Sequence, residues 1–466
     1  MKRRDFVKRV TLAGTSLAFM PGLTGAANVL GAPVRTGRNI SNGNTIRIGL
    51  IGHGNMGRED TNAALACEDI KLTAVCDLYD PRLELAKKQW GNDLFLTKDY
   101  YKLLERKDID AVLIATPDHW HKQIILDALH AGKHVFCQKP LIHKLDDADE
   151  LLAAHKGSNK IIQVGSQGVA SLGNQKAKQL LQSGIIGDLT HVSGSFTKYL
   201  GFHEIDPEAN EKTIWWDRFL GTAPKIPFEA LRFLYWRGFE EYSTGIAGDL
   251  FVHVISSLHY ITDAEGPEQI YATGDIMHYK DVHQRTSPDL MLGTFRYPRC
   301  NNIGPFYLSL SANLSDGVSK EWSSTNFKLT GVKGIIEVGW DWVRLKTDED
   351  IDMSVFSNLK PLGHNIDIPK QVDFKRKKQD GYFMGYSSFE KEPTNEFLFQ
   401  VDNTYEGGHI NHLNNFFMGI RTNTPVQSDL LFGLRAAAPA ILSNASNHSG
   451  SPVYWDPGKL RMVDKK

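Results

Sequence analysis

Residues 48–57 read Ile-Gly-Leu-Ile-Gly-His-Gly-Asn-Met-Gly, and this stretch decides the fold. A short apolar segment leads into three glycines, Gly52, Gly54 and Gly57, with the spacing Gly-x-Gly-x-x-Gly. Residues 58–67 have the pattern of a helix, and Asp77 lies twenty positions after Gly57, at the end of a second apolar segment. Strand, glycine turn, helix and spaced acid together predict a dinucleotide-binding domain.

The three glycines have separate expected roles at the pyrophosphate of the cofactor. Gly52 permits a tight turn, Gly54 lets the backbone approach the pyrophosphate, and Gly57 lets the helix pack closely on the strand. Asn55 and Met56 lie in the glycine turn just before the helix, whose N-terminus favours anions through its free N–H groups and its dipole. The structural alternative is an ordinary strand-to-helix turn that contains three glycines.

Asp77 stands where an acid hydrogen-bonds the hydroxyls of the adenosine ribose. A carboxylate there repels the 2′-phosphate of NADP, so the sequence favours NAD as the cofactor. Arg82 lies close by in the sequence and keeps NADP as the less favoured alternative.

Apolar strand-like segments alternate with helical ones as far as residue 165. This alternation predicts a doubly wound parallel sheet of the Rossmann type. The expected strands are 72–76, 111–115, 134–137 and 161–164, and the expected helices are 81–90, 100–106, 120–131 and 146–155.

The N-terminus has the features of an export signal. A basic start contains Arg3-Arg4 followed by Phe6, and an apolar segment, 10–23, leads to small residues at 24–27. This order predicts a twin-arginine signal peptide over 1–32 and a linker over 33–45. A disordered basic tail with an anchoring helix is the alternative.

The expected location is the periplasm, reached by export of the folded protein. The apolar segment is shorter than the roughly 20 residues that span a bilayer, so we expect no stable membrane anchor. Removing residues 1–32 leaves 48 basic and 53 acidic residues, a net charge of about −5. That charge argues against nucleic acid as a partner.

Two loops at strand ends carry candidate cofactor residues. Thr116-Pro117 and His121 follow one strand, and Gln138-Lys139-Pro140 follows the next. Because ligands bind outside the carboxyl ends of such strands, we expect both loops to face the cofactor. We expect no metal site at the histidines, because no thiol or carboxylate is spaced nearby as a third ligand.

With these motifs the chain resembles the Gfo/Idh/MocA oxidoreductases. The resemblance rests on the glycine turn, Thr116-Pro117 with His121, Lys139-Pro140, and three later segments: 179–187, 248–253 (Gly-Asp-x-x-x-His) and 416–425. It covers nearly the whole chain after the signal. It implies that Lys139, Asp249 and His253 flank the nicotinamide and the substrate and carry the catalysis.

Gln138 departs from the family pattern, which usually has glutamate before the lysine. A neutral amide does not offset the charge of Lys139. Loss of that offset suggests that Lys139 gives up its proton more readily and serves as a base. A degenerate site is the alternative.

The second half supplies the expected substrate site. Asp249 and His253 are four residues apart, so on a helix they share a face, and the carboxylate could hold the imidazole in one tautomer. Without the family resemblance, a buried structural pair would be the better interpretation. Further side chains combine aromatic faces with hydrogen-bonding groups that suit a sugar ring: Trp236, Arg237, Tyr242 and the segment 215–217.

Residues 166–466 are expected to form a C-terminal α+β domain for substrate binding and oligomerisation. Alternating segments predict a large, mostly antiparallel sheet, which the resemblance makes an oligomer face, in a dimer or a tetramer. Residues 349–406 are interpreted as a long excursion, a lid or partner contact. Helices are expected at 409–421 and 428–446, packed back on the core. The expected strands are 191–197, 269–274, 289–295, 306–312, 326–330, 334–338 and 342–346.

Chemistry and compartment together give the functional hypothesis. We expect an exported NAD(P)-dependent oxidoreductase that acts on a CH–OH group of a sugar or glycoside, with C3 favoured, and that recycles one tightly bound nicotinamide. The first alternative is an NAD-dependent glycosidase that works by oxidation, elimination, addition and reduction. The second is an inactive, cofactor-bound scaffold that binds sugar, which Gln138 would explain.

Overall fold

The computed structural model describes residues 45–197, 205–280, 284–314, 326–347, 360–364, 395–401 and 407–465. The predicted signal peptide over 1–32 and residues 33–44 of the predicted linker lie outside these residues. The described chain therefore begins just before the first strand of the dinucleotide fingerprint.

A six-stranded parallel sheet carries the glycine turn, in the strand order β3-β2-β1-β4-β5-β6. The central strands β1, β4, β5 and β6 are largely buried, which explains their mostly apolar sequences. The strands are β1 (Ile46–Ile51), β2 (Ile70–Cys76), β3 (Phe95–Thr97), β4 (Ala111–Ile114), β5 (His134–Gln138) and β6 (Ile162–Gly165). The connecting helices are α1 (Asn55–Leu65), α2 (Asp80–Trp90), α3 (Tyr100–Leu104), η2 (Asp118–Trp120), α4 (His121–His130) and α5 (Asp147–Ser158).

An eleven-stranded sheet follows, in the order β14-β15-β13-β12-β11-β7-β10-β9-β8-β16-β17. Its paired strands are antiparallel, apart from β7 with β10, which is parallel. The strands are β7 (Leu189–Thr197), β8 (Gln269–Asp275), β9 (Leu290–Tyr297), β10 (Phe306–Asn313), β11 (Phe327–Gly331), β12 (Gly334–Val338), β13 (Trp342–Thr347), β14 (Lys360–His364), β15 (Asn395–Gln400), β16 (Val453–Asp456) and β17 (Arg461–Val463).

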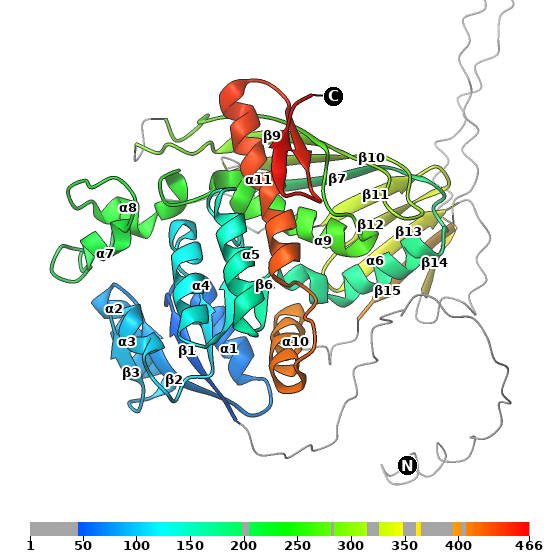
Figure 1. The fold of residues 1–466 in the computed structure, drawn as a ribbon. Coiled ribbons are helices and arrows are strands. Elements are labelled where there is room, and N and C mark those ends of the chain that lie inside the picture. Colours follow the sequence, from blue (N-terminus) through cyan, green and yellow to red (C-terminus); the bar gives the residue numbers. More distant parts are fainter. Residues whose placement is uncertain are drawn as a thin grey trace, which may run out of the picture. The chain divides into compact units, whose positions relative to one another are not determined.

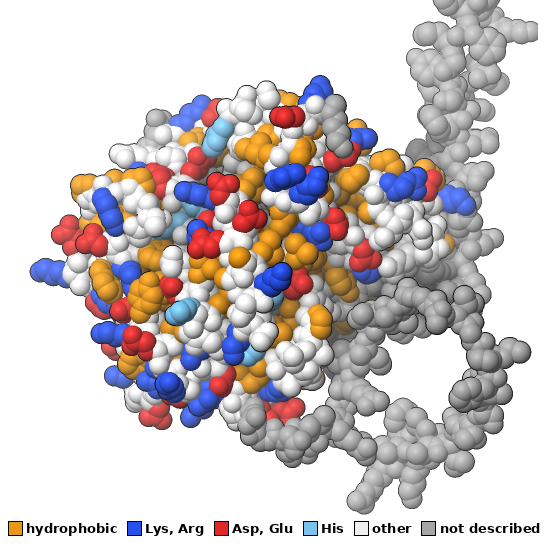
Figure 2. Space-filling view, in the orientation of Figure 1, with side chains coloured by type: hydrophobic (Ala, Val, Ile, Leu, Met, Phe, Trp, Pro, Cys, Tyr) orange, Lys and Arg blue, Asp and Glu red, His pale blue; other side chains and the backbone are white. Residues whose placement is uncertain are grey.

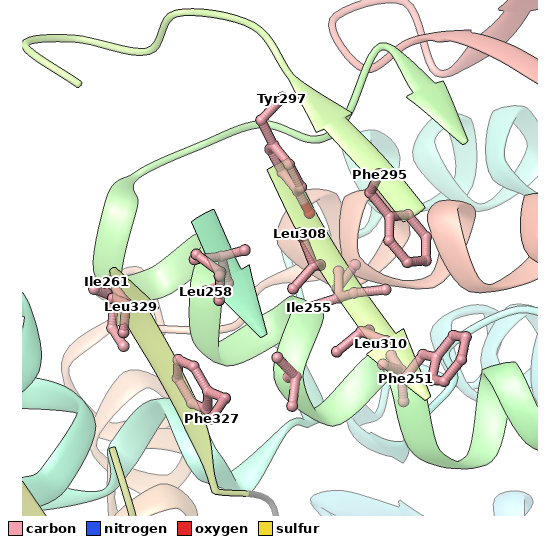
Figure 3. Packing of buried hydrophobic residues seen from close by; sticks show 14 of the residues in the cluster. Phe251, Ile255, Leu258, Ile261, Phe295, Tyr297, Leu308, Leu310, Phe327 and Leu329 are labelled. Carbon is pink, nitrogen blue, oxygen red and sulfur yellow. The ribbon is translucent and has the colours of Figure 1, made fainter. Parts of the chain in front are cut away.

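Helices cover one face of the large sheet. The helix α9 buries an almost continuous apolar surface, and Figure 3 shows its side chains, with Phe251 just before it, among those of β9, β10 and β11. The helices of this half are η3 (Gln167–Ala170), α6 (Leu172–Gln182), α7 (Trp216–Leu220), α8 (Ala230–Leu234), η4 (Trp236–Gly238), the π-helical turn η5 (Ala247–Phe251) and α9 (Val252–Thr262).

Two C-terminal helices join the halves. Phe416 and Phe417 of α10 (Gly408–Thr422) pack in the same core cluster as Ile48 and Leu50 of β1. The helix α11 (Leu430–Ser449) contacts β6 and α5 at one end and β8 and α9 at the other, and Figure 1 shows it beside both sheets. The two sheets therefore share helices and are held as one unit over 45–466.

The predicted fold class is confirmed: a Rossmann sheet followed by a half with a large, mostly antiparallel sheet. The sequence interpretation missed β3, β16 and β17, which are only three or four residues long. It also treated 349–406 as an excursion, whereas β14 and β15 from that segment extend the large sheet. The rest of the segment lies outside the described residues, apart from Val401.

Basic and acidic side chains are interspersed on the face shown in Figure 2, with apolar side chains between them. Within the described ranges, no helix combines the length and the apolar character needed to cross a membrane.

Candidate active site

The glycine turn leaves open space where a pyrophosphate would lie. Gly52 has φ +98°, a conformation that only glycine adopts easily. A Cβ on Gly57 would lie 2.0 Å from the carbonyl oxygen of Gly52, so helix and strand pack as closely as the fingerprint requires. A Cβ on Gly54 would meet no atom within 4 Å. Backbone groups at the start of α1 therefore face free space, and the residues present fit an NAD pyrophosphate.

Asp77 holds the glycine turn as well as facing the cavity. Its carboxylate is 5% exposed and accepts hydrogen bonds from the backbone N–H of His53 (2.7 Å) and of Tyr79 (3.0 Å). The guanidinium of Arg82 lies 3.7 Å from the same carboxylate. The acid is thus fixed at the ribose position, with a cation beside it.

One cavity joins the glycine turn to the second half of the chain, with about 1050 Å³ of empty space including its open mouth. Of the predicted residues, it is lined by Gly52, Gly54, Asn55, Met56, Asp77, Thr116, Pro117, Trp236 and Arg237. No sequence motif singles out several other lining residues: Tyr100, Trp120, Arg218, Phe219, Phe233 and Leu234.

A strap formed by residues 205–242 crosses the adenosine end of this cavity. The backbone N–H of Asp80 donates to the carbonyl of Thr213 (3.1 Å), and that of Trp215 donates to the carbonyl of Leu78 (3.0 Å). Figure 1 shows α7 and α8 of the strap above α2. The sequence interpretation assigned residues 215–217 to sugar binding, but they pack near the adenosine end.

Arg218 attaches the strap to the nucleotide domain. Its guanidinium bonds Asp99 at 2.9 Å and lies within 6 Å of four aromatic rings: Tyr100, Tyr101, Trp120 and Trp215. A partly desolvated cation on aromatic faces contributes on the order of 1–2 kcal/mol. The strap is therefore attached by polar and aromatic contacts in addition to apolar packing.

A compact charge cluster adjoins the cavity at Arg237, while Lys139, Asp249 and His253 are not among the residues that line the cavity. The ammonium of Lys139, whose side chain is only 8% exposed, donates to the carboxylate of Asp249 at 2.9 Å and to its carbonyl at 2.7 Å. Arg237, which lines the cavity, contacts the same carboxylate oxygen at 3.2 Å. Burial by itself would raise the pKa of Asp249, but Lys139 and Arg237 outweigh it and hold that pKa well below its usual range. Asp249 is therefore ionised.

This cluster replaces two sequence expectations. Asp249 offsets the charge of Lys139, so the structure gives no support to the idea that Gln138 leaves Lys139 uncompensated. Among the described residues, no hydrogen bond joins Asp249 to His253. Burial, together with the charge of Lys139, lowers the pKa of His253 to about 3, so the imidazole is neutral near pH 7 and is a weak base.

Three predicted contact residues lie behind the cavity wall. The ring of His121 is buried and spans the carbonyls of Pro140 (2.8 Å) and Thr116 (3.0 Å), so it joins the two loops. Gln138 is also buried and bonds Asp60. Tyr242 is 1% exposed and packs on Phe219 in an aromatic cluster, so its place as a sugar contact is corrected to a core position.

Trp236 and Arg237 do face the cavity. The guanidinium of Arg237 lies 4.3 Å from the centroid of the Trp236 ring. Within the described ranges, no group of three or more His, Cys, Asp or Glu is placed to hold a metal ion.

Comparison with known proteins agrees with this geometry. Residues 46–166 match the family model for the Gfo/Idh/MocA oxidoreductases, described as an NAD-binding Rossmann fold. The nucleotide domain is thus similar to this family, and the match agrees with the Rossmann sheet that the structure shows over these residues.

Relatives of this family extend the similarity. The chain is 26% identical over 252 residues to myo-inositol 2-dehydrogenase of Thermotoga maritima, covering 54% of this chain and 65% of that protein. It is 27% identical over 185 residues to a glycosyl hydrolase family 109 protein of Shewanella sp. (strain ANA-3), covering 37% and 39%. The chain thus spans less than two thirds of either relative.

The whole fold has solved counterparts. A levoglucosan dehydrogenase in complex with NADH and levoglucosan aligns with a TM-score of 0.64 and 17% identity, over 88% of this chain and 99% of that one. At this identity the likeness shows the fold, including the second half that the family model does not reach.

Proposed function

We propose that this protein is an exported NAD-dependent oxidoreductase that oxidises a hydroxyl of a sugar or glycoside, with C3 favoured, on a retained nicotinamide. The observation that carries the proposal is the cavity that runs from Gly54 and Asp77 to Arg237, which contacts Asp249 and, through it, Lys139. Arg237 thus connects the cofactor cavity to the charge cluster proposed for proton handling.

The residues present would hold NAD along this cavity. The glycine turn takes the pyrophosphate, Asp77 the adenosine ribose, and Thr116-Pro117 the side toward the nicotinamide. NAD, when bound, supplies the electron acceptor for a carbinol C–H bond. The matched inositol dehydrogenase and the levoglucosan complex favour a polyol or sugar as the donor of that hydrogen.

The chain's own residues would move the hydroxyl proton. His253, which is neutral near pH 7, would accept this proton, but its pKa of about 3 makes it a weak base, so the negative charge on the substrate oxygen needs a stabilising neighbour. Lys139, fixed by Asp249, would donate a hydrogen bond to the substrate oxygen and stabilise the negative charge that develops there. Asp249 would orient Lys139 and Arg237, in place of the expected role of orienting His253.

Retention of the cofactor follows from the strap. Residues 205–242 cross the adenosine end and are attached by backbone hydrogen bonds and by Arg218. Release would require these contacts to open, which slows dissociation. Export through the signal with Arg3-Arg4 into a compartment without free NAD would make this retention necessary.

Recovery of the nucleotide tests export, retention and cofactor choice together. In periplasmic fractions purified without added cofactor, acid extraction is expected to release one NAD(H) per chain. Asp77 accounts for NAD over NADP, because its carboxylate repels a 2′-phosphate. Protein confined to the cytoplasm, protein free of nucleotide, or recovery of NADP(H) would each contradict the corresponding part of the proposal.

A redox-cycling glycosidase is the second candidate, favoured by the matched glycosyl hydrolase family 109 proteins. In that cycle, oxidation at C3 acidifies the C2 proton. A base removes this proton, the C1 substituent leaves, water adds, and the same two electrons return to C3. Incubation with a glycoside in deuterated water separates the candidates: a 3-keto product supports the dehydrogenase, and free sugar with deuterium at C2 supports the glycosidase.

We further propose that the open face of the eleven-stranded sheet joins copies of this chain into a dimer or tetramer. The helices α6, α9 and α11 cover the opposite face, while Tyr271, Leu292 and Tyr307 remain 43%, 49% and 50% exposed. Ser, Thr and Gly positions around them leave a shallow hollow with about 1380 Å³ of empty space including its open mouth. An interface of this kind would bury the apolar side chains.

Light scattering tests this interface. The native protein is expected to be oligomeric at micromolar concentration, and Leu292→Glu is expected to shift it to monomer, because a buried unpaired carboxylate is costly. Leu85→Glu, at a 39% exposed position on α2, is the matched control and should change nothing. A monomeric native protein would remove the proposal.

A further inference from the structure

A buried carboxylate lies directly behind the lysine loop. Asp60, on α1, is 1% exposed, and its two oxygens accept hydrogen bonds from the side-chain amides of Gln138 (2.6 Å) and Gln167 (3.3 Å). These residues come from the helix after the glycine turn, the end of β5, and the start of the second half. One side chain therefore connects the three elements that build the site.

The geometry requires a hydrogen-bond donor at position 138. The backbone N–H of Lys139 donates to Oε1 of Gln138 (3.3 Å), which fixes the amide so that its Nε2 points to Asp60. Gly165 makes the space, since a Cβ there would lie 2.9 Å from this amide. A glutamate at 138 would instead bring two carboxylates into contact, which is costly in a buried site.

We infer that Asp60 and Gln138 form a coupled pair that positions Lys139, with Asp60 carrying the carboxylate that the family usually has at position 138. Gln138 then supplies the hydrogen-bond donor that the carboxylate of Asp60 needs. Its departure from the family pattern therefore does not indicate a degenerate site. The inference rests on the role of Lys139 in the proposed function. Asp60 acts through Gln138 and is a positioning residue.

The pair is sensitive to pH. Burial raises the pKa of Asp60 to about 7, against the opposing effect of its hydrogen bonds from the two glutamines. The titratable groups whose charges act on the pair are Glu59 on the same helix and Cys137 on β5. Because the ionised form accepts both amide hydrogen bonds best, the positioned state gains population as pH rises through about 7.

An exchange of the two side chains tests the coupling. In the double variant Asp60→Asn with Gln138→Glu, every hydrogen bond is kept. The new amide at position 60 donates to the new carboxylate at position 138 and accepts from Gln167, and that carboxylate still accepts from the backbone of Lys139. Gln138→Glu alone places two carboxylates together, and Asp60→Asn alone places an amide donor against a donor from one of the glutamines. All three variants keep the shape of the native side chains.

Turnover should follow this pattern. Gln138→Glu is expected to lower kcat about 100-fold at pH 8, since a misplacement near 1 Å costs that much, with recovery toward pH 5, where the carboxylates share a proton. Asp60→Asn should lower kcat about 10-fold and remove the rise near pH 7. The kcat of the double variant should return to within about 5-fold of the native value. A double variant with a kcat as low as those of the single variants would contradict the coupling.

Gln163→Glu is the matched control. Gln163 is fully buried in β6 and bonds the carbonyl of His412, away from Asp60, so Asp60→Asn should not rescue it. If Asp60→Asn also restored the kcat of Gln163→Glu, the rescue would reflect general stability and not a specific pair, and the inference would be overturned. A native protein that binds NADH but oxidises no sugar would contradict the proposed function alone, because thermal unfolding of the same variants still reports the coupling between Asp60 and Gln138.

Discussion

Replacing Lys139 by alanine is expected to lower sugar turnover by about 10²–10⁴-fold while one NAD(H) per chain remains bound. The reason is local: the lysine ammonium is held at 2.9 Å from Asp249 and, in the proposed function, donates a hydrogen bond to the reacting oxygen. The glycine turn, Asp77 and the strap do not involve this side chain. Steady-state kinetics and acid extraction of the same preparation measure the two effects.

The pKa of Asp249 provides an independent readout of this change. Without Lys139, burial is opposed mainly by Arg237, so the pKa of Asp249 should rise. Lys178→Ala is the control, because Lys178 forms an ion pair with Asp263 outside the site and should leave turnover intact. Unchanged turnover in Lys139→Ala would remove Lys139 from the mechanism.

Gly57→Ala is expected to destabilise the nucleotide domain by about 2–3 kcal/mol and to abolish cofactor binding. The added Cβ would lie 2.0 Å from the carbonyl oxygen of Gly52 and 3.3 Å from the side chain of Leu50. Neither β1 nor α1 can yield without disturbing the turn between them, since the backbone of Gly52 is held to Cys76 at 2.8 Å. Thermal unfolding and NADH titration measure the loss.

Gly54→Ala is the matched comparison, since it adds the same methyl group three residues earlier. Its Cβ would meet no atom of the chain, and its backbone, at φ −78° and ψ −168°, suits alanine. The unfolding temperature should therefore stay near that of the native protein. NADH affinity should fall, because the methyl group enters the space of the pyrophosphate. Equal destabilisation by both substitutions would contradict this account of the turn.

The fold was largely predictable because its signals are local. The central strands of the nucleotide domain are largely buried, so β1, β2, β4 and β5 appear as mostly apolar segments. Alternation identified β9, β10 and β13 in the same way. Strands of three or four residues such as β3 and β17 carry too few positions to show either pattern.

Part of the site was equally local. Gly52, Gly54 and Gly57 act within one turn, and the spacing to Asp77 is set by a single helix and strand. A resemblance placed Lys139 and Asp249 in one site, and the structure brings them into contact. The roles expected for His121 and Tyr242 could not be judged from type and position, because their burial depends on contacts with other segments of the chain.

By itself the sequence determined the Rossmann sheet, the glycine turn and the acid at its ribose end, because each depends on short-range spacing and backbone conformation. Only the tertiary structure decided which carboxylate faces which cation. It paired Asp249 with Lys139 and Arg237, set Asp60 against Gln138, and laid the strap across the adenosine end. Asp60 and Gln138 are 78 positions apart, and Lys139 and Asp249 are 110 apart. Contacts between residues so far apart in the sequence cannot be predicted from their spacing, because they form only when the elements pack together.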